Sequence, residues 1–286
     1  MADLKALATR PSVRRFRIDR IGSEAGTADD FVATEEPLEI RLEYASAGKR
    51  VERSISITMR TPGNDEELAV GFLLSEGIIR DRKDVTLVRP CGPPAANGLI
   101  NVVRVELADD LAFDIDRLER HFYTSSSCGV CGKASLDAVR VQGRFDISSF
   151  DLGIAAGVLE SLPDSLVAEQ AVFEETGGLH ASGLFDPSGR IVAVREDVGR
   201  HNALDKLIGS RLMRDEIPLS GYGIMVSGRA SFELMQKAMM AGCPLVAAVG
   251  APSSLAVEMA QEFGMTLVGF LKRDRFNVYS RGDRVS

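Results

Sequence analysis

The sequence predicts an α/β fold, with a smaller α+β domain over residues 1–123 and a layered α/β domain over residues 124–286. Two observations lead to it. After residue 179, short strands that are apolar on both faces alternate with helices, which is the pattern of a parallel or mixed sheet covered on both sides. Before residue 110, strand-like segments alternate apolar and polar side chains, as β-hairpins do.

The first expected elements are strands. A loosely held polar arm precedes a short strand near residues 12–18. Apolar side chains then alternate with polar ones over residues 38–44 and 55–59, and Gly48 lies between the two segments. Alternation on both sides of a glycine predicts a hairpin.

A helix follows the hairpin, and its ends carry recognisable signals. Asn64 is expected to cap it, Glu67 three residues later to complete a capping box, and Gly77 to end it. An apolar strand over residues 99–107 and a short helix over residues 114–120 complete the N-terminal domain.

The C-terminal domain is predicted from alternating strand and helix patterns. Pro163 in a first turn and Gly177 at the end bracket one helix, with Leu166 and Phe173 near its buried face. The remaining strands are expected at residues 179–186, 190–196, 224–227, 245–250 and 266–271. The remaining helices are expected at residues 134–141, 199–212, 231–241 and 253–263.

Composition excludes several classes of function. The net charge of −7 disfavours broad, non-specific nucleic-acid binding, which needs a basic surface. No window reaches the roughly 18 consecutive apolar residues of a membrane span, and residues 1–10 show no secretory signal. Four cysteines in 286 residues are no disulfide framework, so a reducing cytoplasm is expected.

Two of the four cysteines, Cys128 and Cys131, form a CxxC motif among small residues. This spacing suits thiol exchange, half a zinc site or sulfur carriage. A helix beginning just after the motif, with Lys133 nearby, would favour the thiolate. The alternative is two small buried residues in a glycine-rich turn. Cys91 and Cys243 are expected to be structural.

A zinc site would need more ligands than the sequence offers around this motif. A structural site requires a second CxxC or paired histidines. The zinc deaminases carry His-x-Glu before Pro-Cys-x-x-Cys, whereas Ser127 replaces the proline here and no His-x-Glu precedes it. Sulfur carriage needs only one nucleophilic cysteine with room around it.

Two serine-containing loops, at residues 227–231 and 251–254, each follow a strand and open a helix. Such positions bind anions in open α/β sheets, and Arg229 adds a fork suited to phosphate or carboxylate. The alternative is ordinary helix capping by Ser227, Ser231 and Ser253.

Three further features allow two interpretations each. His180 follows a glycine pair that permits close approach of a ligand, or it is an ordinary hydrogen-bonded residue. The basic and aromatic segment 270–276 suits a phosphorylated partner with a ring to stack, or is a solvated tail. The polar segment 195–203 is a buried network lining a pocket, or Asp197 merely caps a helix.

Several long motifs occur in order between about residues 35 and 280, and together they resemble the FdhD family, the sulfurtransferase accessory proteins of formate dehydrogenase. The matching segments are residues 59–63, 66–79, 128–133, 176–181, 196–206 and 227–229, and the terminal strand with Phe270, Arg275 and residues 277–279.

The resemblance implies a fold similar to the cytidine deaminases without their zinc chemistry, and no tightly held metal. It implies that a cysteine desulfurase gives sulfane sulfur to Cys128 as a persulfide, with Cys131 as partner. The acceptor would be the molybdenum or tungsten of Mo-bis(molybdopterin guanine dinucleotide), bound as a substrate before insertion into the formate dehydrogenase catalytic subunit. A cytoplasmic homodimer is expected.

The expected cofactor-binding residues come from the family segment and from the anion sites. They are Phe270, Leu271, Lys272, Arg273, Asp274, Arg275, Ser227, Gly228, Arg229 and His180. Two alternatives remain beside the sulfurtransferase. A non-catalytic chaperone of the cofactor would retain function after Cys128→Ala, and a zinc hydrolase would contain stoichiometric zinc.

Overall fold

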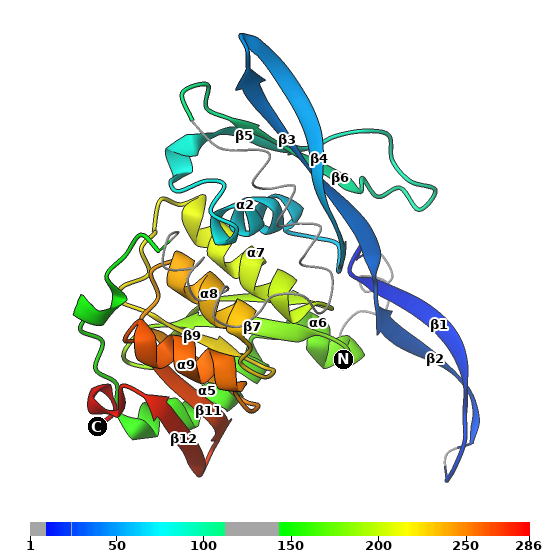
Figure 1. Cartoon of the computed structure of the whole chain (residues 1–286). Helices are drawn as coiled ribbons and strands as arrows, with labels where there is room; N and C mark the ends of the chain where they lie inside the picture. The colour runs from blue at the N-terminus through cyan, green and yellow to red at the C-terminus, as the bar shows by residue number, and fades with distance from the viewer. Residues whose placement is uncertain (1–9, 24, 112–142) are drawn as a thin grey trace.

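The computed structural model describes residues 10–23, 25–111 and 143–286. A two-stranded ribbon, a four-stranded sheet and a six-stranded sheet follow one another along the chain (Figure 1). Helices pack between and against the two larger sheets, so the predicted α/β class is confirmed. Both cysteines of the CxxC motif and the helices expected at residues 114–120 and 134–141 lie outside the described residues.

The N-terminal half is mainly β-structure. The ribbon extends away from the body (Figure 1). The four-stranded sheet has the order β4-β3-β6-β5, so the predicted hairpin of β3 and β4 is confirmed. Alternate residues of β3 are buried as expected, but on β4 the apolar side chains of Ile57 and Met59 are exposed. The strands are β1 (Val13–Arg20), β2 (Gly26–Ala33), β3 (Glu36–Ser46), β4 (Lys49–Arg60), β5 (Val85–Pro90) and β6 (Val102–Leu107).

Helix α2 (Asp65–Ser75) packs on the buried face of this sheet. The predicted capping box at its start is wrong. Asn64 has a left-handed backbone (φ 57°) and its side chain makes no capping hydrogen bond. The Glu67 carboxylate instead accepts a 2.7 Å hydrogen bond from Arg195 Nη2. Arg195 lies far along the chain, in the strand over residues 191–197, so this ion pair competes with the local capping hydrogen bond. Gly77 (φ 71°) ends the helix as expected.

The six-stranded sheet has the order β12-β11-β10-β9-β7-β8. Strands β9, β10 and β11 are parallel and the other pairs antiparallel, so the expected mixed sheet is confirmed. Its strands are β7 (His180–Phe185), β8 (Ile191–Asp197), β9 (Gly223–Val226), β10 (Leu245–Ala248), β11 (Thr266–Lys272) and β12 (Arg275–Ser280). Short 3₁₀ turns are η1 (Arg82–Asp84), η2 (Ile147–Ser149) and η3 (Gly282–Arg284).

Helices cover both faces of this sheet, as the two-face-apolar strands predict. One hydrophobic cluster joins α7, α8 and α9 to one face, and a second joins α5 to the other. The helices are α5 (Ala156–Ala168), α7 (Arg200–Leu212), α8 (Phe232–Met240) and α9 (Ser254–Glu262).

The single helix expected between Pro163 and Gly177 is two helices. Pro163 lies inside α5 rather than in a first turn. The chain breaks at Gln170 (φ −90°, ψ 76°) and restarts as α6 (Ala171–Thr176), which ends at Gly177 in the left-handed conformation. Leu166 is buried as expected.

The two larger sheets share one hydrophobic cluster, which contains residues of β3, α2, α7 and β9. Helices α2 and α7 approach closely because each has a glycine that faces the backbone of the other helix. A Cβ on Gly71 would lie 1.9 Å from the Asp205 carbonyl oxygen, and one on Gly209 would lie 1.9 Å from that of Glu67. The division between residues 123 and 124 falls outside the described residues and stays a prediction. Within the described residues, no helix is long and apolar enough to span a membrane.

Candidate functional site

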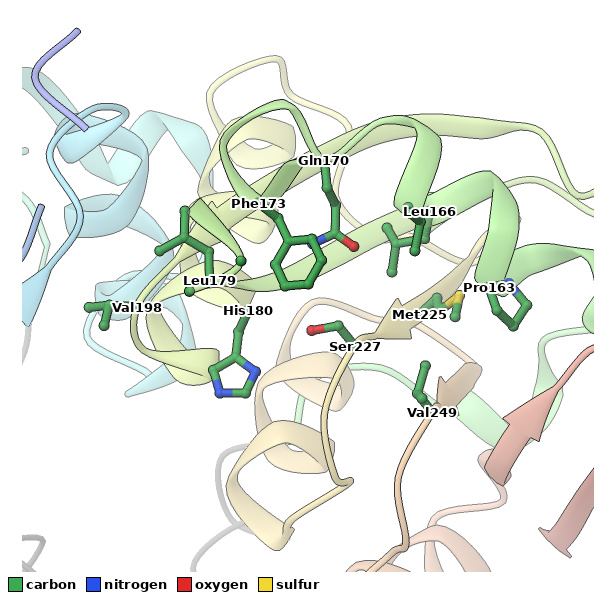
Figure 2. A pocket seen from close by; sticks show the side chains of 13 residues that line it. Pro163, Leu166, Gln170, Phe173, Leu179, His180, Val198, Met225, Ser227 and Val249 are labelled. Atoms are coloured by element: carbon green, nitrogen blue, oxygen red, sulfur yellow. The ribbon is translucent and has the colours of Figure 1, made fainter. Parts of the chain in front are cut away.

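A cavity of about 530 Å³ lies between helices α5 and α6 and one edge of the six-stranded sheet (Figure 2). Strands β9 and β10 end at this edge and the antiparallel β7 begins there. Its lining is mostly apolar, with Leu166, Phe173, Met225 and Val249 on the walls. Ligands collect at the carboxyl ends of strands in open α/β sheets, and this volume suits a small organic molecule.

His180 lines this cavity at the first position of β7. Burial lowers the pKa of His180 below its ordinary value, and the nearby charges of Arg200 and His201 lower it further, against an opposing effect of Asp197. A neutral imidazole offers one donor and one acceptor. The preceding glycine pair, Gly177 and Gly178, also lines the cavity, and the binding of a ligand at His180 stays a prediction.

Ser227 lines the cavity directly after β9. Its Oγ accepts a 2.9 Å hydrogen bond from the Ala181 backbone N–H, so Ser227 fastens two strand ends and is not a helix cap. Ser231 and Ser253, by contrast, are ordinary helix caps, which was the alternative interpretation of these loops. Their hydroxyls accept hydrogen bonds at the starts of α8 and α9. The Ser227 hydroxyl proton remains available to a ligand.

The rest of this loop lies beside the histidine. A Cβ on Gly228 would lie 3.5 Å from His180 Nδ1, so Gly228 and His180 are adjacent. Arg229 is exposed and forms no ion pair with any described residue. Its backbone packs against Gly250, where a Cβ would lie 3.1 Å from Arg229 N. The structure therefore brings His180 and the loop of residues 227–229 together at one end of the cavity.

The expected cofactor segment, residues 270–275, comprises the end of β11, the turn at residues 273–274 and the first residue of β12. Phe270 is 43% exposed and has a left-handed backbone (φ 52°). Such a conformation is costly for an aromatic residue and is often found at functional sites. Its N–H donates to the Gly250 carbonyl at 3.0 Å, which connects Phe270 to the loop after β10, and Gly250 in that loop packs against Arg229.

The remaining side chains of this segment divide into buried and exposed ones. Leu271 is fully buried in the cluster that includes α5. Arg273 contacts the Asp164 carboxylate, which places the turn next to Pro163 on the cavity wall. The exposed charged side chains are Lys272, Arg273, Asp274 and Arg275. The segment thus lies beside the cavity, and Leu271 supports it from within the core.

The polar segment at residues 195–203 forms a buried network. Asp197 is fully buried and accepts hydrogen bonds from the backbone N–H groups of Thr61 (3.1 Å) and Gly199 (2.9 Å) and from Asn202 Nδ2 (3.1 Å). Lys206 Nζ lies 2.7 Å from the Asp197 carboxylate. The network fastens the end of β4 to β8 and α7, and Val198 beside it lines the cavity.

Sequence reasoning missed the role of α6 and of Gln170. Phe173 was expected only as a core residue, yet it lines the cavity with Gln170. The backbone N–H groups of Val172 and Phe173 donate to the Glu196 carboxylate at 3.0 and 2.8 Å, so a strand residue caps this helix. The one available signal was the density of polar groups around Glu196.

The described residues contain two of the four cysteines, Cys91 and Cys243. The described part of the chain contains no cluster of three or more histidine, cysteine or acidic side chains placed to hold a metal. Burial raises the pKa of the Cys243 thiol to about 12, and its Sγ donates to the Leu245 carbonyl at 3.2 Å, as expected of a structural cysteine. Cys91 is partly exposed and free.

A sequence model of the FdhD/NarQ family matches residues 33–286, which include the whole cavity wall and the buried network. The chain belongs to the FdhD/NarQ family. The resemblance drawn from the motifs is thereby confirmed. The ribbon strand β1 precedes the family match, and the cavity lies inside it.

Relatives in the FdhD/NarQ family cover nearly the full length. The "Sulfur carrier protein FdhD" of Streptomyces coelicolor is 50% identical over 95% of both chains. That of Mycolicibacterium paratuberculosis is 52% identical over 90% of this chain and 92% of its own, and the archaeal one of Saccharolobus solfataricus is 41% identical over 96% and 98%.

A solved structure shares the fold. The crystal structure of a putative formate dehydrogenase accessory protein from Desulfotalea psychrophila superposes with a TM-score of 0.70 and covers 96% of this chain and 100% of its own. It is 22% identical, so this likeness concerns the arrangement of helices and strands alone.

Proposed function

We propose that the protein is a sulfurtransferase that carries sulfane sulfur from a cysteine desulfurase to the molybdenum or tungsten of a bis-pterin guanine dinucleotide cofactor. The observation that carries the proposal is the near full-length similarity to relatives named sulfur carrier protein, together with the CxxC motif of Cys128 and Cys131. The cofactor is a substrate here and goes on to formate dehydrogenase. The protein acts as a homodimer in the cytoplasm.

In the first step, the Cys128 thiolate attacks the outer sulfur of the donor's persulfide. The donor's S–S bond breaks, a new S–S bond forms on Cys128, and the donor leaves as a thiolate. Cys128 then carries a persulfide, whose terminal sulfur is the nucleophile for the metal. Cys131 has two alternative roles. It attacks the Cys128 Sγ, so that the terminal sulfur leaves as sulfide to the metal and a Cys128–Cys131 disulfide remains for an external thiol to reduce. Alternatively it positions the persulfide, and an external thiol makes the attack on Cys128 Sγ.

The cavity supports the cofactor part of the proposal. Its mostly apolar walls suit a planar base. His180, Ser227 and the exposed Arg229 at one end suit the phosphates that follow such a base. The exposed cations of the β11–β12 turn, next to Pro163, explain why an acidic protein keeps a local basic surface: the cofactor carries four phosphates.

Intact-protein mass spectrometry tests the sulfur step. The full chain is incubated with a cysteine desulfurase and cysteine, and wild type is compared with Cys128→Ala and Cys131→Ala. We expect wild type and Cys131→Ala to gain one sulfur that dithiothreitol removes, and Cys128→Ala to gain none. Cys243→Ala is the matched control, because that thiol is buried with a raised pKa.

A different pattern would favour the non-catalytic chaperone. If no variant gains sulfur while guanine nucleotide still binds, the protein holds the cofactor without transferring sulfur to it. Equal sulfur on wild type and Cys128→Ala would place the persulfide on another cysteine.

A further inference from the structure

Gln170 is a buried polar residue whose side-chain amide has no hydrogen-bond partner among the described residues. The residue is 3% exposed and lines the cavity. Its backbone is satisfied: the N–H donates to Val167 and the carbonyl accepts from Glu174. The amide atoms are not sealed in the core: they open onto the cavity, where water or a ligand can pair with them. An amide left unpaired at a cavity wall is therefore available to a ligand.

A polar side chain at the position of Gln170 would ordinarily cap the helix that follows. It directly precedes α6, but its amide makes no capping hydrogen bond. The Glu196 carboxylate occupies that role, because it accepts from the N–H groups of both Val172 and Phe173. Glu196 thus holds α6 in place from β8 and leaves the Gln170 amide free to face the cavity.

The surroundings of this amide are apolar and include one aromatic ring. Figure 2 shows the Gln170 amide directed between the Phe173 ring and Leu166, with Met225 farther along the wall. A flat heterocycle has apolar faces and a polar edge. Phe173 and Leu166 suit the faces, and the amide suits the edge.

We propose that Gln170 hydrogen-bonds the edge of the guanine base of the bound cofactor, while Phe173 packs on a face of the base. The identity of the base rests on the proposed function above. A glutamine amide presents one acceptor and one donor side by side. These match the N1–H donor and the O6 acceptor of guanine.

An amide can rotate, so Gln170 alone does not select guanine over adenine, and the sharper test changes the pattern of its hydrogen bonds. In Gln170→Glu, two acceptors replace the acceptor–donor pair. A carboxylate pairs with the N1–H and N2–H groups of guanine. Hypoxanthine lacks the 2-amino group and offers only one of these donors.

The experiment is isothermal titration calorimetry of the full chain with GDP and with IDP. Gln170→Met keeps the length of the side chain without its hydrogen bonds, and we expect GDP affinity to fall by about tenfold. For Gln170→Glu, we expect the ratio of GDP to IDP affinity to rise by about tenfold over wild type. Gln261→Met, on the exposed side of α9, is the matched control and should bind as wild type does.

Two results would overturn the proposal, and they are distinguishable. If wild type binds GDP and neither the affinity nor the GDP-to-IDP ratio changes in either Gln170 variant, Gln170 does not contact the base, and the proposed function stands. If folded wild type binds neither nucleotide at millimolar concentration, the guanine part of the proposed function fails with it. The persulfide measurement on Cys128 decides the sulfur part separately.

Discussion

Two buried charges meet where α7, α8 and α2 come together. Lys237 Nζ lies 2.7 Å from Asp205 Oδ2, and Asp205 Oδ1 accepts a 2.8 Å hydrogen bond from Ser75. Burial by itself lowers the pKa of Lys237, but the charges of Asp205 and Glu76 outweigh it and leave the pKa above its ordinary value. Lys237 therefore keeps its positive charge in the folded protein, beside the Asp205 carboxylate.

Removing one member of this pair should be costly. Asp205→Asn leaves the Lys237 ammonium buried without its counter-charge, so we expect a loss of about 3–5 kcal/mol in the free energy of unfolding. Urea denaturation measures it. The double variant Asp205→Asn/Lys237→Met should recover most of the loss, and a double variant no more stable than the single one would contradict this explanation.

His180 should make stability depend on pH. Its pKa is lowered on folding, so the unfolded chain binds more protons than the folded one below about pH 6.5. Stability should then fall as pH drops from about 6.5 through the folded pKa. Urea unfolding of wild type and His180→Asn at several pH values measures this effect. The variant should lose less stability on acidification, and identical pH profiles would refute the assignment to His180.

At the residue scale, sequence reasoning found His180 and Ser227 as candidates, because glycine pairs and strand-end serines have local signatures. It assigned Asn64 and Glu67 to a capping box, since that motif is also local. The pairing of Glu67 with Arg195 could not be predicted in this way, because Arg195 lies far along the chain. Gln170 escaped notice because its unpaired amide is visible only once its neighbours are placed.

Helices α2 and α7 pack backbone against backbone, and glycines make this close approach possible. Gly209→Ala would place a methyl group 1.9 Å from the Glu67 carbonyl oxygen. The helices would have to separate, so we expect a loss of about 3 kcal/mol or more in stability. Thermal or urea unfolding provides the measurement.

A helical glycine with open space around it supplies the control for this substitution. A Cβ added to Gly157 in α5 would meet no atom within 4 Å. Gly157→Ala should therefore stabilise by up to about 1 kcal/mol, through helix propensity alone. Similar effects of the two substitutions would show that the α2–α7 contact is looser than described.

At the element scale, the strands and helices from residue 179 to 272 were predicted to within a few residues, because buried strands and capped helices have strong local patterns. Strand β12, which is largely exposed, was not expected. The break between α5 and α6 was not predicted either. Pro163 and Gly177 are standard end signals, but tertiary packing allowed α5 to continue through the proline. The fixed position of α6 depends on Glu196, which arrives from another strand.

The two larger sheets share one hydrophobic cluster, and the buried Asp197–Lys206 network fastens them at a second place. The described residues should accordingly unfold as one unit. We expect urea transitions followed by far-ultraviolet circular dichroism and by tyrosine fluorescence to coincide. Tyr44 lies on β3 and Tyr222 near β9, so both sheets contribute to the fluorescence signal. Two separated transitions would instead indicate independently folding domains.

By itself, the sequence determined the α/β class, the order of most elements and the family, since periodicity, helix ends and ordered motifs are local properties of the chain. Only the tertiary structure decided that His180, Ser227, Phe173 and Gln170 line one cavity. These residues come from different elements, and their meeting depends on strand order and on contacts between distant segments. Those contacts are set by the packing of the whole chain, which no local pattern records.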